Sequence, residues 1–437
     1  MKYLKSALNL LRSIRSRSPV FERAYNLLRH CYDDSLYRNS VYLMMANFTG
    51  AGIGFFFWII AARIYETEEI GKATAIISST LLLTSISLLG LNIAAIKFLP
   101  RSKKMKEDIH TLITTVLIAA VVVVSGYMIG LEYFAQNLLF LRENAWYLLF
   151  FLIITIVTAL EFIYNSVFIA QRQAGYVFLK SLIGNMTKVV LPFFLISFGA
   201  FGVYLSATSV QVVSFVLSGI FLHRLIGYRL RPAFNTVLLS RMFRLSFSNY
   251  IASFTAGLPM MLMPIMLNNT LGPRQAAFFY INMMFVNLLK TVQQSTSNSL
   301  LAEGSYNSED IRGYLIKAGK MTLILLVPLI LFIVFFGKYI LLAFGREYSV
   351  EGVNLLRMLA VSVIFTSING MLSAVLNIKG RANLILLMCI IGPLILLSLI
   401  YFALPHGLVA LGLAWLVGEA LIALIYVLLV TFIFKLL

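Results

Sequence analysis

Residues 40–76 read SVYLMMANFTGAGIGFFFWIIAARIYETEEIGKATAI. A tyrosine near the start is followed by small, glycine-containing positions, a long apolar run and a short polar turn. After the turn the chain becomes apolar again through alanines. An apolar run of about 20 residues has the length of a helix that crosses a bilayer. The stretch therefore predicts one membrane-spanning helix, a short turn and a second helix that re-enters the bilayer.

Composition extends this prediction to the whole chain. Of the 437 residues, 60% are hydrophobic and 12% are charged, and the mean hydropathy is +0.91. A soluble domain carries about twice that charged fraction. We therefore expect an all-α integral membrane protein with about twelve transmembrane helices. The predicted spans are 40–63, 73–97, 109–131, 145–170, 179–199, 201–223, 246–268, 277–302, 318–343, 354–378, 383–404 and 408–434.

The formal net charge of +18 has to be explained by its placement. Most of the 35 lysines and arginines fall in the tails and the even-numbered loops, which the positive-inside rule assigns to the cytoplasm. The charge therefore sets the topology and faces anionic membrane lipids, and no nucleic acid is needed as a partner. Both termini are predicted to be cytoplasmic, in a multi-pass protein of the cell (plasma or inner) membrane.

Two residue types that often mark metal sites are sparse. Cys31 and Cys389 lie far apart without motif spacing, and the histidines fall at span ends or in loops. This pattern predicts no disulfide, no metal site and no cofactor.

The chain divides into four expected segments. Residues 1–39 lack the apolar core of a signal peptide and form a basic cytoplasmic tail, read either as an interfacial helix on the inner leaflet or as a solvated tail. Residues 40–226 form an N-lobe of six helices, 227–245 a cytoplasmic linker and 246–437 a C-lobe of six helices.

The two lobes open in the same way. Residues 248–281 read SNYIASFTAGLPMMLMPIMLNNTLGPRQAAFFYI and share the order of the opening stretch: tyrosine, small residues, apolar run, polar turn and alanines. Six spans separate the two openings, so both helices start on the same side of the membrane. We expect a parallel repeat related by a pseudo-twofold axis along the membrane normal, with a cleft between the lobes.

Three helix-end motifs resemble a known family. They are AARIYETEEIGKATAI (61–76), LGLNIAAIKFLPRSKK (89–104) and FIAQRQAGYVFLKSLI (168–183). The chain resembles the polysaccharide transporters, or oligosaccharide (Wzx-type) flippases, of the superfamily that also holds the MATE multidrug exporters and lipid II flippases. The resemblance covers about residues 36–434. It implies a two-lobe carrier with alternating access that moves a lipid-linked oligosaccharide, usually on polyprenyl pyrophosphate, from the inner to the outer leaflet.

Charged residues inside spans need a partner or a wet cavity. Glu161 and Lys188 lie about equally far from the turn near residue 174, so helices four and five bring them to similar depth. A structural ion pair between them is the first interpretation, a cavity-lining role for Lys188 is the second, and snorkelling to the inner interface is the third.

Lys290 lies halfway along the eighth span, and no partner for it is evident in a neighbouring span. Asn287, Gln294 and Ser297 share its helical face and Asn298 lies beside them, a pattern suited to the hydroxyls and the phosphate of a glycolipid. A cavity lysine that contacts the anionic cargo is one interpretation. A buried lysine held by carbonyls or by a carboxylate is the other.

Further candidates have weaker patterns. Asn47 is a candidate cavity residue, and Arg63 is a candidate for phosphate contact on release or for interfacial anchoring. Pro259 and Pro264 are candidate hinges in the seventh span. Glu419 is a candidate coupling residue or a protonated structural glutamate.

The charged residues within the spans favour some classes of function over others. A cation-coupled drug exporter needs a carboxylate in the cavity, whereas spans one, two, seven and eight contain no acidic residue and the eighth carries a lysine. A membrane glycosyltransferase or polymerase needs acidic residues and sizeable outer loops, and the predicted outer loops are short. A flippase without enzymatic activity, with the lipid-linked oligosaccharide as its substrate and polysaccharide-assembly proteins as candidate partners, is the leading hypothesis.

Overall fold

The computed structural model describes residues 35–228, 233–306 and 311–434, so the predicted interfacial helix of the N-terminal tail lies outside the described residues. Among the described residues, twelve long helices make up the molecule, with shorter helical segments between them. The first six are α3 (Ser35–Ile64), α4 (Thr67–Leu88), α6 (Met105–Ile129), α8 (Ala145–Ala170), α9 (Ala174–Val190) and α10 (Gly199–Ile226). The other six are α11 (Thr236–Thr270), α12 (Pro273–Tyr306), α13 (Ile311–Leu342), α15 (Val353–Ile378), α16 (Ala382–Ala403) and α17 (Gly407–Phe434).

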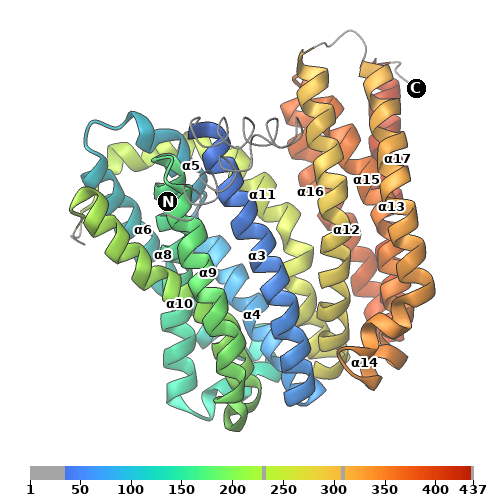
Figure 1. Cartoon of the computed structure of the whole chain (residues 1–437), viewed down its shortest axis with the longest axis horizontal. Coiled ribbons are helices and arrows are strands. Elements are labelled where there is room, and N and C mark those ends of the chain that lie inside the picture. Colours follow the sequence, from blue (N-terminus) through green and yellow to red (C-terminus); the bar gives the residue numbers. More distant parts are fainter. Residues whose placement is uncertain (1–34, 229–232, 307–310, 435–437) are drawn as a thin grey trace, which may run out of the picture.

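The predicted all-α membrane fold of two six-helix lobes is confirmed. Figure 1 shows the first six helices, coloured blue to green, side by side with the yellow-to-red helices of the second set. In the N-lobe α9 packs between α3 and α10, and in the C-lobe α15 packs against α12, α13 and α17. The lobes meet where α4 packs against α11 and α12.

The described residues contain nine candidate membrane spans, which are helical stretches long and apolar enough to cross a bilayer. The last of them covers both α16 and α17. Two long helices are missing from this set for local reasons. Helix α9 has 17 residues, and α12 carries many polar side chains along its length. These two helices carry Lys188 and Lys290; α9 is absent from the set because it is short, and α12 because it is polar.

The second predicted span, 73–97, is interrupted in the structure. Helix α4 ends at Leu88, and after Leu89 and Gly90 the chain continues as α5 (Leu91–Phe98). Both linking residues have positive φ angles, 50° and 74°, and a side chain at Gly90 would come within 2.6 Å of the Cβ of Tyr250 on α11. The break therefore lets the end of the span approach the other lobe.

The start of the C-lobe also differs from the expected boundary. Helix α11 begins at Thr236, where the Asn235 side chain accepts a hydrogen bond from the Leu238 amide, so residues 236–245 of the predicted linker are helical. Pro259 and Pro264 both lie inside this continuous helix.

The outside of the molecule is apolar. Large aliphatic and aromatic side chains of α13, such as Ile324 and Phe335, are 72% and 68% exposed. An exposed apolar surface of this kind suits lipid rather than water.

Candidate functional site

A small cavity lies inside the N-lobe and is closed on one side by the C-lobe. Its volume is about 170 Å³, and its polar wall consists of hydroxyl and amide groups together with one lysine. The lining side chains are Trp58, Ile77, Thr80, Leu81, Thr158, Lys188, Ala207, Thr208, Gln211 and Tyr280. Only Tyr280, on α12, comes from the C-lobe, and its ring lies 4.8 Å from that of Trp58. No carboxylate is present in this wall.

Lys188 is the charged group of this cavity. Its Nζ lies 4.6 Å from the centre of the Phe57 ring, and among the described residues it makes no hydrogen bond or ion pair. The Oε1 atom of Gln211, in the same wall, is buried and also has no partner. The described residues therefore leave an ammonium donor and an amide acceptor without partners, and an anion that also carries hydroxyls could bond to both.

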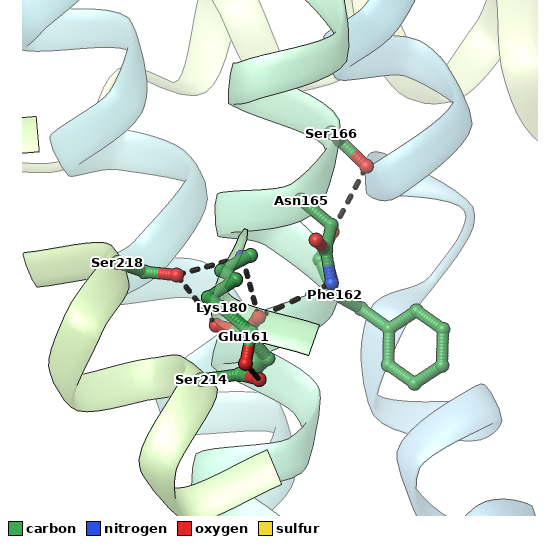
Figure 2. A network of polar contacts seen from close by, with 7 residues as sticks. All are labelled: Glu161, Phe162, Asn165, Ser166, Lys180, Ser214 and Ser218. Atoms are coloured by element: carbon green, nitrogen blue, oxygen red, sulfur yellow. Dashed lines mark hydrogen bonds and ion pairs between the residues drawn. The ribbon is translucent and has the colours of Figure 1, made fainter. Parts of the chain in front are cut away.

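The predicted ion pair between Glu161 and Lys188 is wrong, because Glu161 is paired with Lys180 (Figure 2). The Nζ of Lys180 donates to Glu161 Oε1 at 2.5 Å and to Ser218 Oγ at 2.7 Å, and that hydroxyl donates to Glu161 Oε2 at 2.9 Å. Asn165 Nδ2 also donates to Oε1, at 3.2 Å. Lys180 is 1% exposed and Glu161 is 4% exposed, so the network is sealed from solvent.

The error has a geometric cause. The turn between α8 and α9 lies between residues 170 and 174, closer to Glu161 than the prediction assumed, so Lys188 lies deeper than the carboxylate. Depth also says nothing about rotation, and residues eight positions apart on a helix point about 80° apart. Lys180 was missed because the fifth span was predicted to begin at 179, which placed this lysine at the membrane surface. Lys180 is closer to the turn in sequence than Lys188 is, and this difference could have indicated Lys180 as the partner of Glu161.

In the C-lobe, Lys290 lies at the edge of the open face of α12. Its Nζ is 5.9 Å from the centre of the Trp415 ring, and it interacts electrostatically with Glu419, one turn further along α17. Asn369 Nδ2 donates to Glu419 Oε2 at 2.9 Å. Glu419 belongs to the twelfth span, not to a neighbouring one, and its electrostatic interaction with Lys290 keeps open the second interpretation, a lysine held by a carboxylate.

The predicted polar face of α12 is divided by the structure. Asn287, Gln294 and Asn298 are exposed, whereas Ser297 is 7% exposed and accepts a hydrogen bond from Gln293 Nε2 at 3.2 Å. Ser297 therefore belongs to the packing between α12 and α15 in this structure, and the other three form the open polar face.

The remaining candidates have simpler surroundings. Asn47 is exposed on α3. Among the described residues no cluster of histidine, cysteine and carboxylate side chains could hold a metal ion. A larger hollow of about 840 Å³ lies at the start of α11 beside Arg241 and Arg244, but it is an open surface of exposed residues without a buried polar group.

Comparison with known proteins identifies the family. The family described as polysaccharide biosynthesis protein matches residues 36–263, more than half of the chain. The chain belongs to this family. An uncharacterized membrane protein of Methanocaldococcus jannaschii is 23% identical to this polysaccharide biosynthesis family member over 90% of the chain and 97% of the relative.

The fold of this family member is also that of known transporters. The lipid II flippase MurJ, in an inward closed conformation, matches with a TM-score of 0.72 and 15% identity, over 89% of this chain and 87% of the other. An inward-facing MATE-family multidrug transporter of the MOP superfamily matches with a TM-score of 0.70 and 15% identity, over 90% and 97%. An outward-facing structure of a transporter with the same description gives 0.56. The chain is thus a multi-pass membrane protein with the MOP-superfamily fold, and it matches the inward-facing arrangement better.

Contacts between the lobes agree with this arrangement. At the end of the molecule that carries the α3–α4 turn, Arg63 Nε and Nη2 donate to the carbonyl oxygens of Ala343 and Leu342 at 2.9 and 2.6 Å. Thr67 Oγ1 donates to Glu347 Oε2 at 2.7 Å, and Asn269 Nδ2 donates to the carbonyl oxygen of Phe134 at 3.1 Å. Arg63 of this polysaccharide biosynthesis family member therefore joins the two lobes at the end that is predicted to lie outside, and its side chain stays exposed there.

Proposed function

We propose that this protein is a flippase that moves a lipid-linked oligosaccharide, carried on polyprenyl pyrophosphate, from the cytoplasmic to the outer leaflet by alternating access. It would reside in the cell membrane with both termini in the cytoplasm. Family membership supports a role in polysaccharide assembly, and the fold supports transport. One of the proteins that share this fold is a lipid II flippase.

The observation that carries the proposal is the uncompensated charge of Lys188. A lysine without hydrogen bonds or a carboxylate is costly within a membrane span unless a ligand or water satisfies it. The hydroxyl and amide groups around it suit the hydroxyls of a sugar, and its ammonium suits phosphate. The cavity holds only a small part of a glycolipid, so we assign it to the pyrophosphate end and the adjoining sugar.

Lys290 takes a second place in this proposal. The exposed Asn287, Gln294 and Asn298 would line the path of the oligosaccharide along α12, with Asn47 as a further polar contact on α3. Lys290 would meet the phosphate only when it leaves the neighbourhood of Trp415 and Glu419. The main cationic contact therefore moves from the C-lobe lysine, which the sequence favours, to Lys188.

The charge of the cavity argues against a drug exporter with the same fold. Attraction of organic cations requires a carboxylate, whereas the described cavity wall offers an ammonium group. A glycosyltransferase or polymerase would need an acid–base or metal site, and the only carboxylate found near either candidate lysine in the described residues is Glu419.

The driving force follows from the charge of the cargo. An interior-negative potential favours outward movement of an anion by about 2.3 kcal/mol per charge per 100 mV. The sequence contains no G-x-x-x-x-G-K-[ST] loop for ATP. We therefore propose transport driven by the membrane potential and by consumption of the product at the outer surface, where polysaccharide-assembly proteins would act.

The test is outward movement of a fluorescent pyrophosphate-linked oligosaccharide in proteoliposomes under an imposed potential. A hydrogen bond to a charged group contributes about 1.5–3 kcal/mol, so K188Q should slow movement about 10- to 100-fold at limiting substrate. K320Q, which neutralises an exposed lysine on α13, is the matched control and should behave as wild type.

The outcomes separate the hypotheses. If K188Q and K320Q both match the wild-type rate, Lys188 is not the phosphate contact. If the wild-type protein moves no glycolipid but exports organic cations, the drug-exporter function takes the place of the flippase.

A further inference from the structure

Helix α9 carries two lysines with opposite surroundings. Lys180 is buried and bonded to Glu161 and Ser218, whereas Lys188, two turns further along, has no polar partner among the described residues. The N-lobe thus neutralises one ammonium group completely and leaves the other for the cavity.

Between the two lysines, α9 is fitted closely onto α10. A Cβ atom at Gly184 would come within 2.9 Å of the carbonyl oxygen of Val210 and 3.0 Å of its Cα. One turn further along, the hydroxyls of Thr187 and Ser209 are 3.3 Å apart. The two helices therefore contact each other through backbone and small polar groups, and such a contact fixes both register and rotation.

The network around Glu161 is the fixed end of this contact. Ser218 lies on α10 and Glu161 on α8, so the bonds of the Lys180 ammonium join α9 to both neighbours, as Figure 2 shows. Ser214 Oγ also donates to the carbonyl oxygen of Lys180 at 3.4 Å. Since the rise and turn of a helix are fixed, holding Lys180 sets the depth and direction of Lys188.

We propose that the Glu161–Lys180–Ser218 network is a positioning device that directs Lys188 into the cavity and leaves it as the single uncompensated ammonium group of α9. Only the identity of the group that Lys188 binds rests on the proposed flippase function. Buried ion pairs contribute little net stability compared with apolar residues of the same volume, so a role in geometry explains this costly arrangement better than a role in stability does.

The experiment measures the position of residue 188 without any cargo. The chain contains two cysteines, so C31S/C389S supplies a background in which K188C introduces a single thiol. The rate at which a small water-soluble methanethiosulfonate reagent modifies this thiol reports how it faces the cavity. K103C, exposed before α6, is the matched control site.

Removal of the network should change this rate. With E161L/K180M added, α9 loses its polar attachment, and we expect the K188C modification rate to change at least about tenfold while the K103C rate stays constant. The exchanged pair E161K/K180E should bring the rate back to within about twofold of the starting background. A K188C rate unaffected by E161L/K180M overturns the proposal.

A milder variant keeps the test decisive if the double substitution does not fold. S218A leaves the ion pair intact but removes the hydroxyl that joins α10 to both charged groups. We expect a change of about threefold in the K188C rate, and an unchanged rate argues against positioning. Because these rates involve no glycolipid, they can support the positioning role even where the flippase assay fails, and the reverse also holds.

Discussion

The two lobes each bury a carboxylate, but they satisfy it in different ways. In the N-lobe, Glu161 has an ammonium group at 2.5 Å and further bonds from a serine and an asparagine. In the C-lobe, Glu419 is 8% exposed and bonded to Asn369, while Lys290 acts on it without a contact ion pair in the described structure.

The difference also appears in the atoms left without partners. Beside Glu419, the Oδ1 of Asn369 and the Nε1 of Trp415 are buried and make no hydrogen bond. Around Glu161 the Oδ1 of Asn165 is the corresponding exception, and both carboxylate oxygens are bonded. The N-lobe cluster thus bonds both oxygens of its carboxylate, whereas the C-lobe cluster leaves polar atoms unpaired beside its own, so we expect the C-lobe cluster to be the less rigid of the two.

The largest expected effect follows removal of one charge from the N-lobe cluster. E161Q leaves Lys180 buried without its counterion and should lower the free energy of unfolding by about 3–5 kcal/mol, measured by thermal unfolding in detergent. E161L/K180M removes both charges and should stay close to wild type. Equal losses in the two variants would show that the pair itself supplies the stability.

A methyl group tests how rigid each lobe is. G184A places its Cβ against the backbone of Val210 and should cost about 1–3 kcal/mol. G370A in the C-lobe meets only the side-chain ends of Gln293 and Ser297, which can move, so it should cost less. G52A has open space around its Cβ and serves as the control for helix propensity. Thermal unfolding in detergent ranks the three variants, and a cost for G370A equal to that of G184A would remove the distinction between the lobes.

The C-lobe counterpart of the first variant should have a smaller effect. E419Q keeps an acceptor and a donor for Asn369, and Lys290 lies at the edge of an open face where its ammonium can reach water. We expect a loss of about 1 kcal/mol, typical of a hydrogen bond changed rather than removed. A loss as large as that of E161Q would mean that Lys290 and Glu419 form an equally fixed pair.

The smallest effect concerns the contact between the lobes. R63A removes two bonds to the carbonyl oxygens of Leu342 and Ala343, but Arg63 is exposed and water can replace them. A change of about 1 kcal/mol shifts the balance between open and closed states about fivefold.

The measurement for R63A is the distance distribution between spin labels. Labels at Y133C and Y339C, on exposed positions of α7 (Leu131–Phe134) and α13, should report a larger open fraction in R63A than in wild type. K338A, an exposed charge near the same end of α13, is the control. An unchanged distribution in R63A would show that Arg63 does not hold the outer end closed.

Much of the fold is already contained in local sequence patterns. Apolar runs, the polar turns between them and the placement of lysine and arginine predict helices that agree with the structure to within a few residues for spans such as 145–170 and 354–378. Two spans agree less well: 179–199 corresponds to α9 at Ala174–Val190, and 73–97 is broken at Leu89 and Gly90, where α11 lies close. No local pattern shows that close approach.

The candidate site is predicted less completely. The sequence shows that Glu161, Lys188, Lys290 and Glu419 lie within the membrane, and that buried charges there need partners or water. It does not show that Lys180 forms an ion pair with Glu161. Nor does it show that Glu419 interacts with Lys290 or that Arg63 contacts the other lobe. Those contacts join helices through their rotation, which a count of residues from a turn does not determine.

The sequence by itself thus determined a membrane-embedded protein of two similar six-helix halves, with a few charges that the lipid cannot satisfy. Its hydrophobic length and charge placement are properties of single segments, so they can be read one segment at a time. Only the tertiary structure decided which lysine is neutralised and which one faces the cavity. An ion pair forms only where a donor and an acceptor atom from two helices come within about 3 Å of each other. The packing of the helices decides which side chains reach that distance.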